Sequence, residues 1–285
     1  MGAPSVRQRR LGAELRALRD AKGATLEEAA RAAGSGWDKT RLSRVERAQL
    51  GIKPAVMELL LDAYDVTDAD KREVLISLAR HGARRGWWQT YSDILSPAYA
   101  ELIALEADAK SLRSYQTLLI PGLLQTAAYA RTAIAAINLG STPEQVNALV
   151  EVRQARQAVL SRPKPLEVWA IIHEAALRPK AADPVIMRDQ CQRLLDLMAL
   201  PHVSIQVLPF DAPLHPGIAG AFTLLGFPES ADLDVVHVEH LANALYVEDA
   251  ADVSVYGSAF DALRAHALSF DKSADLTARI KQEHS

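Results

Sequence analysis

Leucines recur at helical spacing from Leu11 until Gly23, a residue that commonly ends helices. Thr25 and Glu28 then have the spacing of a capping box, in which each side chain binds a free backbone N–H at the start of a helix. They open a second, alanine-rich helix that ends before the glycines at 34 and 36. The pattern predicts two short helices.

The stretch GWDKTRLSRVERAQ, residues 36–49, predicts a third helix. Asp38 is a good N-cap, and Leu42 and Val45, three residues apart, mark the side that faces the interior. Trp37 and Leu42 stand at the two positions of a hydrophobic staple. The opposite side of this helix is polar and basic.

Two more helices complete the first domain. Pro54 begins a helix over VMELLLDAY, and Thr67 with Asp70 caps a fifth helix through LISLARHGARR. The basic stretch HGARRG, residues 81–86, precedes a change in composition at Trp87. We therefore expect an all-α, five-helix domain at residues 1–86.

The pattern of residues 87–285 predicts a second domain with both helices and strands. Helices are expected over 99–116, 120–137, 143–160 and 187–200, and again from residue 252 to the end. Four β-rich stretches lie between them, namely LEVWAII, VSIQVLPF, AFTLLGF and DVVHVEH with its continuation ALYVE. The predicted fold class is α+β multidomain, with a mostly antiparallel sheet in this second, mixed α/β domain.

Charge is distributed unevenly between these regions. Residues 1–53 contain twelve Lys or Arg against six Asp or Glu, although the net charge of the whole chain is −3. A basic module on an acidic remainder is typical of a protein in which one part binds a polyanion. A basic surface that is merely solvated is the alternative.

Composition indicates a globular protein, since 49% of the residues are hydrophobic. The single cysteine, Cys191, cannot form an internal disulfide and is expected to be a small buried hydrophobe. No apolar run approaches the ~18 residues of a membrane span, and no signal peptide is seen. We expect a cytoplasmic protein, nucleoid-associated when it is bound to DNA.

The sequence GAELRALRDAKGATLEEAARAAG followed by KTRLSRVER resembles the helix-turn-helix of the Xre (phage-repressor-like) family. The resemblance covers about residues 11–66 and implies binding to double-stranded DNA. In that family an arginine of helix 1 pairs with the glutamate that ends helix 3. The matching residues are Arg19 and Glu46.

A recognition helix inserted in the major groove contacts bases with one set of side chains and phosphates with another. The candidates for base contacts are Lys39, Thr40 and Arg44. The candidates for phosphate contacts are Thr25, Arg41, Ser43, Arg47 and Lys53. Ala48 replaces the glycine that usually follows this helix in the family, so we expect the helix to continue for about one turn.

The second domain also resembles a known family. The blocks LEADAKSLRSYQTLLIPGLLQTAAYAR, HEAALRP, VSIQVLPF, AFTLLGFPE and VVHVEHLANALYVED are similar to the C-terminal domain of unknown function of many actinobacterial Xre-type regulators. WhiJ-like regulators of Streptomyces belong to this group. The resemblance implies the architecture of a regulator and, by analogy, a small protein encoded nearby as a partner.

Five residues of the second domain are candidates for a partner or ligand surface. They are Trp87, Trp88, His215, Glu239 and Tyr246. Each has a structural alternative. The two tryptophans could pack at the domain junction, and His215 could make a hydrogen bond within a turn. Glu239 and Tyr246 could simply alternate between solvent and core along a strand. A homodimer is expected, because proteins of this motif commonly pair on two half-sites.

The histidine pattern argues against an enzyme. His237 and His240 are three apart on a predicted strand and so face opposite sides of it, and HEAAL, which begins with His173 and Glu174, lacks a second metal-binding histidine. No phosphate-binding GxxxxGK and no GxSxG is present. We expect no catalytic site, no cofactor and no metal.

These patterns together predict a sequence-specific DNA-binding transcription regulator whose second domain senses a small protein partner or a ligand. The alternative is an antitoxin-like interaction protein, which sequesters a small partner and binds DNA mainly for autoregulation.

Overall fold

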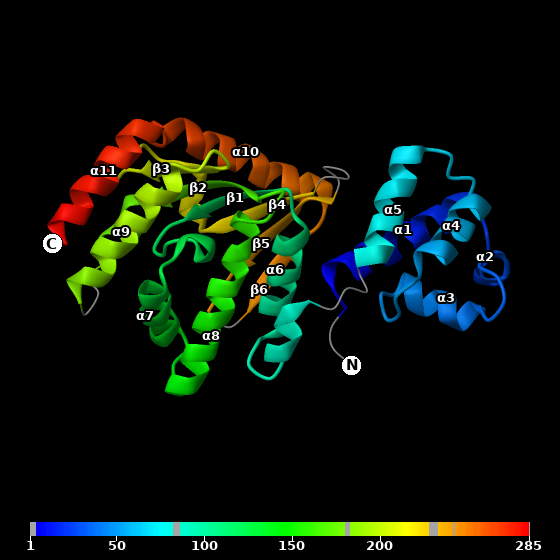
Figure 1. The fold of residues 1–285 in the computed structure, drawn as a ribbon. Coiled ribbons are helices and arrows are strands. Elements are labelled where there is room, and N and C mark those ends of the chain that lie inside the picture. The colour runs from blue at the N-terminus through cyan, green and yellow to red at the C-terminus, as the bar shows by residue number, and fades with distance from the viewer. Residues whose placement is uncertain (1–3, 82–85, 180–182, 228–232, 242, 285) are drawn as a thin grey trace. The chain divides into compact units, whose positions relative to one another are not determined.

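The structure, a computed structural model, describes residues 4–81, 86–179, 183–227, 233–241 and 243–284. The chain forms two compact units, Met1–Trp87 and Trp88–Ser285 (Figure 1). The division falls one residue after the boundary predicted from the sequence. Residues 82–85 of the HGARRG stretch lie outside the described residues.

The described part of the first unit contains five α-helices, at about the positions that the apolar pattern predicts. They are α1 (Val6–Lys22), α2 (Leu26–Ala32), α3 (Lys39–Glu46), α4 (Pro54–Ala63) and α5 (Ala69–His81). Helix α1 begins earlier than the leucine pattern indicates, because Ser5 and Gln8 form a capping box at its start.

The expected extension of the third helix is wrong. Helix α3 ends at Glu46, and Ala48 has a φ of 58°, in the left-handed region that usually favours glycine. The N–H groups of Ala48 and Gln49 donate to the carbonyls of Val45 and Arg44 at 2.8 Å and 2.7 Å. These bonds close the helix in the way a C-terminal glycine normally would.

Helices α1 and α3 approach each other closely at Gly12. A Cβ atom at this position would lie 2.6 Å from the carbonyl oxygen of Glu46 and 2.7 Å from that of Val45. Only glycine therefore allows this crossing. Buried Leu15 and Leu42 belong to the core of the same unit.

The second unit contains six strands and further helices within its described residues. The strands are β1 (Ser111–Gln116), β2 (Glu167–His173), β3 (Val203–Leu208), β4 (Phe222–Gly226), β5 (Val235–Glu239) and β6 (Ala244–Val247). The α-helices are α6 (Pro97–Asp108), α7 (Ala127–Ile137), α8 (Pro143–Arg156), α9 (Pro184–Met198), α10 (Ala250–His266) and α11 (Phe270–Glu283). Short 3-10 turns are η1 (Trp87–Tyr91), η2 (Gly122–Leu124), η3 (Gln157–Leu160), η4 (Glu174–Leu177) and η5 (Pro216–Ala219).

The strands form one mixed sheet in the order β3-β2-β1-β4-β5-β6. Strands β1, β2 and β3 are parallel, whereas the pairings β1–β4, β4–β5 and β5–β6 are antiparallel. Most pairings are thus antiparallel, but one half of the sheet is a parallel α/β arrangement.

Residues 111–116 are a strand, and the expectation of one helix over 99–116 is wrong. Helix α6 ends at Asp108, and the next residues pair with β2 on one side and β4 on the other. This segment is the centre of the sheet, where ladder hydrogen bonds override local helix preference. The helix expected from residue 120 also begins later, at Ala127, with Thr126 as its N-cap.

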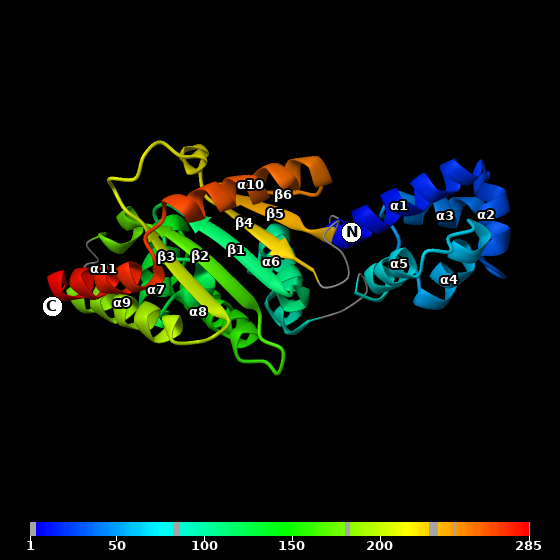
Figure 2. The same ribbon diagram turned by 90° about the horizontal axis from the view of Figure 1, so that it is seen from above.

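Helix α10 covers one face of the sheet (Figure 2). It packs on an apolar core that includes Tyr115, Phe222 and Phe260. Helices α6 to α9 lie on the opposite side, and α11 packs beside α9 and β3 (Figure 1). The face opposite α10 carries a row of buried polar residues, Ser114, Thr223 and His237, at neighbouring register positions.

Candidate nucleic-acid interface

Helix α3 presents a polar face to solvent because its apolar face is fixed in the core. Leu42 is fully buried at 0% exposure, and Val45 is buried beside it. The carboxylate of Asp38 accepts a hydrogen bond from the N–H of Arg41 at 2.7 Å and so defines the start of the helix. Thr40 and Arg47 are exposed on the other side.

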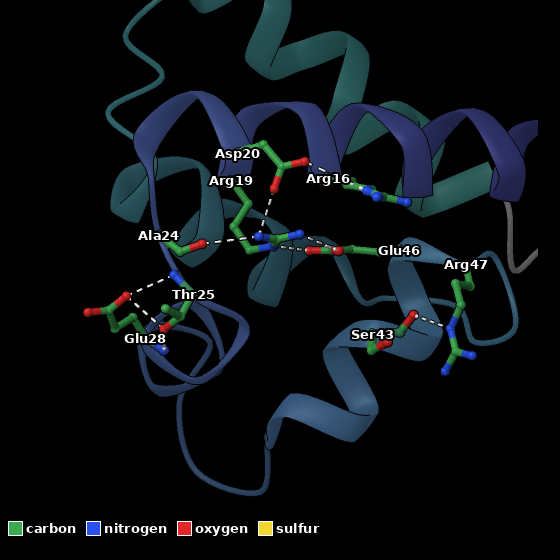
Figure 3. A network of polar contacts seen from close by, with 9 residues as sticks. All are labelled: Arg16, Arg19, Asp20, Ala24, Thr25, Glu28, Ser43, Glu46 and Arg47. Carbon is green, nitrogen blue, oxygen red and sulfur yellow. Dashed lines mark hydrogen bonds and ion pairs between the residues drawn. The ribbon is translucent and has the colours of Figure 1, made fainter.

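Arg19 of α1 and Glu46 at the end of α3 form a bidentate ion pair (Figure 3). The Nε and Nη2 atoms of Arg19 lie 2.6 Å and 3.0 Å from the two carboxylate oxygens. Arg19 also donates to the carbonyl of Ala24 at 3.1 Å and contacts Asp20 at 2.8 Å. The hydrogen bonds that Arg19 donates to the Glu46 carboxylate raise the pKa of Arg19 above its ordinary value. The pair joins α1 to the C-terminal end of α3.

The three predicted base-contacting residues lie on the outer side of α3. Lys39 makes an exposed ion pair with Glu27 at 3.1 Å, which contributes little in water. Thr40 is exposed, and Arg44 is half-buried, with no hydrogen bond or ion pair of its side chain among the described residues. The guanidinium of Arg44 therefore keeps its full donor capacity.

The predicted phosphate-contacting arginines are held by local contacts. Arg41 stacks on the Trp37 ring at 4.5 Å and donates to the carbonyl of Gly36 at 2.9 Å. The Nε of Arg47 donates to the carbonyl of Ser43 at 3.2 Å. Both arginines remain exposed, as does Lys53 before α4. These contacts orient the guanidinium groups and leave further N–H donors free for phosphate oxygens.

Thr25 already makes the capping hydrogen bonds of α2. Its hydroxyl donates to a carboxylate oxygen of Glu28 at 2.7 Å and accepts from the N–H of Glu28 at 3.2 Å. The backbone N–H of Thr25 also donates to this carboxylate at 2.8 Å. This bond, together with the one from the hydroxyl, lowers the pKa of Glu28, so a carboxylate occupies the start of α2. A phosphate contact at Thr25 has to displace this carboxylate.

Two contacts that shape this interface were not predicted from the sequence. Trp37 was assigned only to a hydrophobic staple, and its four-residue spacing from Arg41 was the available signal for their stacking. Gly12 interrupts a leucine-rich helix, which is the usual sign of a close helix crossing.

Two family models match separate parts of the chain. Residues 10–75 match the model of a helix-turn-helix domain, and residues 99–279 match the model of a domain of unknown function (DUF5753). The chain belongs to the DUF5753 family. Searches of curated proteins and of solved structures found no significant match.

Within the DUF5753 protein, the predicted surface residues of the second domain do not form one cluster. Trp88 packs on Leu95, Ile103 and Val152, whereas Trp87 is exposed and belongs to the first unit. Of these two tryptophans, Trp88 is therefore a packing residue, and only Trp87 is exposed.

His215, Glu239 and Tyr246 occupy separate places in the DUF5753 domain. The His215 ring meets that of Tyr115 with centroids 6.1 Å apart, and Glu239 is exposed at the end of β5. Tyr246 stacks on His237 at 5.1 Å, and its hydroxyl donates to the carbonyl of Ala98 at 2.6 Å. Tyr246 is thus a packing residue between β6 and α6.

Among the described residues, no group of three or more His, Cys, Asp or Glu side chains is placed to hold a metal ion. None of the helices described is both long and apolar enough to cross a bilayer.

Proposed function

We propose that this DUF5753 protein is a sequence-specific, Xre-type transcription regulator. Helix α3 reads bases in the major groove through Lys39, Thr40 and Arg44, and the second unit senses a small protein or a ligand. The protein acts as a homodimer in the cytoplasm, and the second unit has a binding role and no catalytic one. The observation that carries the proposal is Arg44, a polar side chain on the outer face of a rigidly held helix, with no partner among the described residues.

The surroundings of α3 support DNA binding over a merely solvated basic surface. Residues 1–53 carry an excess of six basic over acidic residues, and the helix end is fixed by the ion pair of Arg19 and Glu46. Recognition needs such rigidity, because base contacts depend on side chains held in a defined position. A solvated surface has no such requirement.

The direct test is selection of duplex DNA from a random library by the full-length protein. We expect one enriched motif with two half-sites about 34 Å apart, as a paired helix-turn-helix requires. Failure to enrich any motif at low salt would contradict sequence-specific binding. Stable capture of a small protein together with absence of any operator would favour the antitoxin-like alternative.

A further inference from the structure

The carboxyl ends of the three parallel strands meet at one edge of the sheet in the second unit. Strand β3 is outermost and β4 lies next to β1, so the loop between them has to cross the ends of β2 and β1. This loop covers residues 209–221 and contains η5 (Figure 2). In sheets with parallel strands, ligands bind outside this edge at the point where the strand order reverses.

Aromatic and imidazole side chains from three segments gather at this edge. Tyr115 is near the end of β1 and His173 ends β2, while Phe210 and His215 come from the loop. The ring of His215 meets that of Tyr115 with centroids 6.1 Å apart, and Phe210 meets His173 at 5.4 Å. The loop thus contacts the end of each strand that it crosses.

A glycine fixes the loop over β1. A Cβ atom at Gly217 would lie 2.4 Å from the Cε1 atom of Tyr115 and 2.9 Å from the side chain of Leu263. Turn η5 therefore packs directly against the Tyr115 ring. This contact holds the neighbouring His215 at the strand end.

A polar atom at this edge has unused hydrogen-bonding capacity. The Nδ1 atom of His215 is buried and has no partner among the described residues. Buried polar groups are normally paired, so this Nδ1 atom indicates an absent partner. Tyr115, whose ring meets that of His215, is 1% exposed and contributes a hydroxyl to the same edge.

The proton position on His173 follows from its own contact. Its Nδ1 accepts a hydrogen bond from the N–H of Ala175 at 3.1 Å. In the neutral ring the proton is then on Nε2, which is a donor. His173, Tyr115 and His215 together offer donors for an acceptor group such as a carboxylate.

The loop adds exposed apolar side chains to these polar groups. Phe210, Leu214 and Ile218 are 59%, 89% and 66% exposed. All three belong to the loop at residues 209–221, and an exposed apolar patch is commonly part of a binding site. A ligand for this edge is therefore expected to combine an acidic head with an apolar body.

We propose that this edge binds a small organic acid. Its carboxylate accepts hydrogen bonds from Tyr115, His173 and His215, and its apolar body packs against Phe210, Leu214 and Ile218. This edge would be the place where the second unit senses its ligand, so the proposal rests on the sensing role proposed above. Binding of the acid requires no DNA.

Nearby charges permit an anion at this position. The carboxylate of Glu174 lies beside His173 but is neutralised by Arg178, whose Nε is 2.8 Å from it, and it also accepts from the N–H of Phe210. Burial and the neighbouring His215 lower the pKa of His173. A bound anion opposes this shift, so binding takes up protons and strengthens as the pH falls.

The test is calorimetric titration of the full-length protein, without DNA, with hexanoate and with benzoate. The neutral amides hexanamide and benzamide are matched controls of the same size. We expect at least one acid to bind saturably and more tightly at about pH 6 than at about pH 8. Neither amide should bind. No saturable binding of either acid would overturn the proposal, as would equally tight binding of inorganic phosphate.

Variants locate the site. Tyr115→Phe and His215→Gln each remove one hydrogen-bonding group, and each should weaken acid binding about tenfold. His266→Gln, at an exposed histidine of α10, should leave binding unchanged. Unchanged affinity in both site variants, with thermal unfolding showing that they are folded, would refute the assignment. Arg44→Ala should bind the acid as tightly as the unaltered protein does. A failure of acid binding can therefore be distinguished from a failure of DNA recognition.

Discussion

Arg156 of α8 holds both carboxylate oxygens of Glu106 of α6 in the interior of the second unit. Its Nε and Nη2 atoms lie 2.8 Å and 2.6 Å from the two oxygens, and both side chains are buried. A third donor, Nη1, binds the hydroxyl of Tyr99 at 2.6 Å. The coulombic attraction of Glu106 raises the pKa of Arg156 above its ordinary value despite the opposing effect of burial.

Arg156→Leu should lower the free energy of unfolding of the second unit by about 3–5 kcal/mol, since it leaves the Glu106 carboxylate buried without its partner. The double variant with Glu106→Leu should recover much of this loss, because it buries no unpaired charge. Urea unfolding followed by circular dichroism measures both. Arg188→Leu is the matched control at the exposed pair with Asp189 and should change stability by less than about 1 kcal/mol. An equal effect of the two single variants would contradict this account.

Stability should also depend on His237, which lies buried opposite Tyr246. Burial, and then the charge of Arg156, lowers the pKa of His237 to about 4. The unfolded chain binds a proton near pH ~6.5, whereas the folded chain stays neutral until about pH 4. The free energy of unfolding should therefore fall by about 3 kcal/mol as the pH decreases through this window.

Denaturant unfolding at a series of pH values measures this dependence. His237→Gln cannot titrate and should flatten the slope, while His266→Gln should retain it because that imidazole is exposed. A slope that persists in His237→Gln would assign the effect to another group.

The starts of α2 and α3 could be predicted because their caps are local. The predicted cap of α5 by Thr67 with Asp70 is wrong, because the carboxylate of Asp68 accepts from the N–H groups of Asp70 and Lys71. Capping pairs such as Thr25 with Glu28 specify a helix start within four residues, and the structure contains this pair. The end of α3 could not be predicted in the same way. Ala48 adopts a left-handed conformation because the neighbouring structure holds it there, and alanine itself does not signal that conformation.

The second unit was harder to predict because its central strand depends on distant partners. Residues 111–116 pair with segments more than fifty residues away, and their composition alone favoured a continued helix. The candidate ligand site shows the same difficulty. Tyr115, His173 and His215 are separated in sequence and meet only through the order of the strands.

Breaking the ion pair between Arg19 and Glu46 should loosen the recognition helix. Glu46→Gln keeps the side-chain shape but removes the charge, and it should destabilise the first unit by about 2 kcal/mol. Asp20→Asn is the matched control, since Asp20 contacts the same arginine from an exposed position. It should change stability by less than about 1 kcal/mol. Thermal unfolding followed by circular dichroism distinguishes the two variants, and equal shifts would argue against a special role for Glu46.

Arg44 and Arg47 should affect DNA binding in different ways because only Arg44 is assigned to a base. Arg44→Ala should cost about 1–3 kcal/mol on the selected operator and relax preference at one base pair. Arg47→Ala should weaken binding to every duplex and reduce the slope of log affinity against log salt by about one unit. Arg80→Ala, at an exposed arginine of α5, is the control and should change neither quantity. Fluorescence anisotropy with operator and scrambled duplexes at several salt concentrations measures both. Unaltered specificity in Arg44→Ala would remove this residue from base recognition and leave α3 with a phosphate-binding role alone.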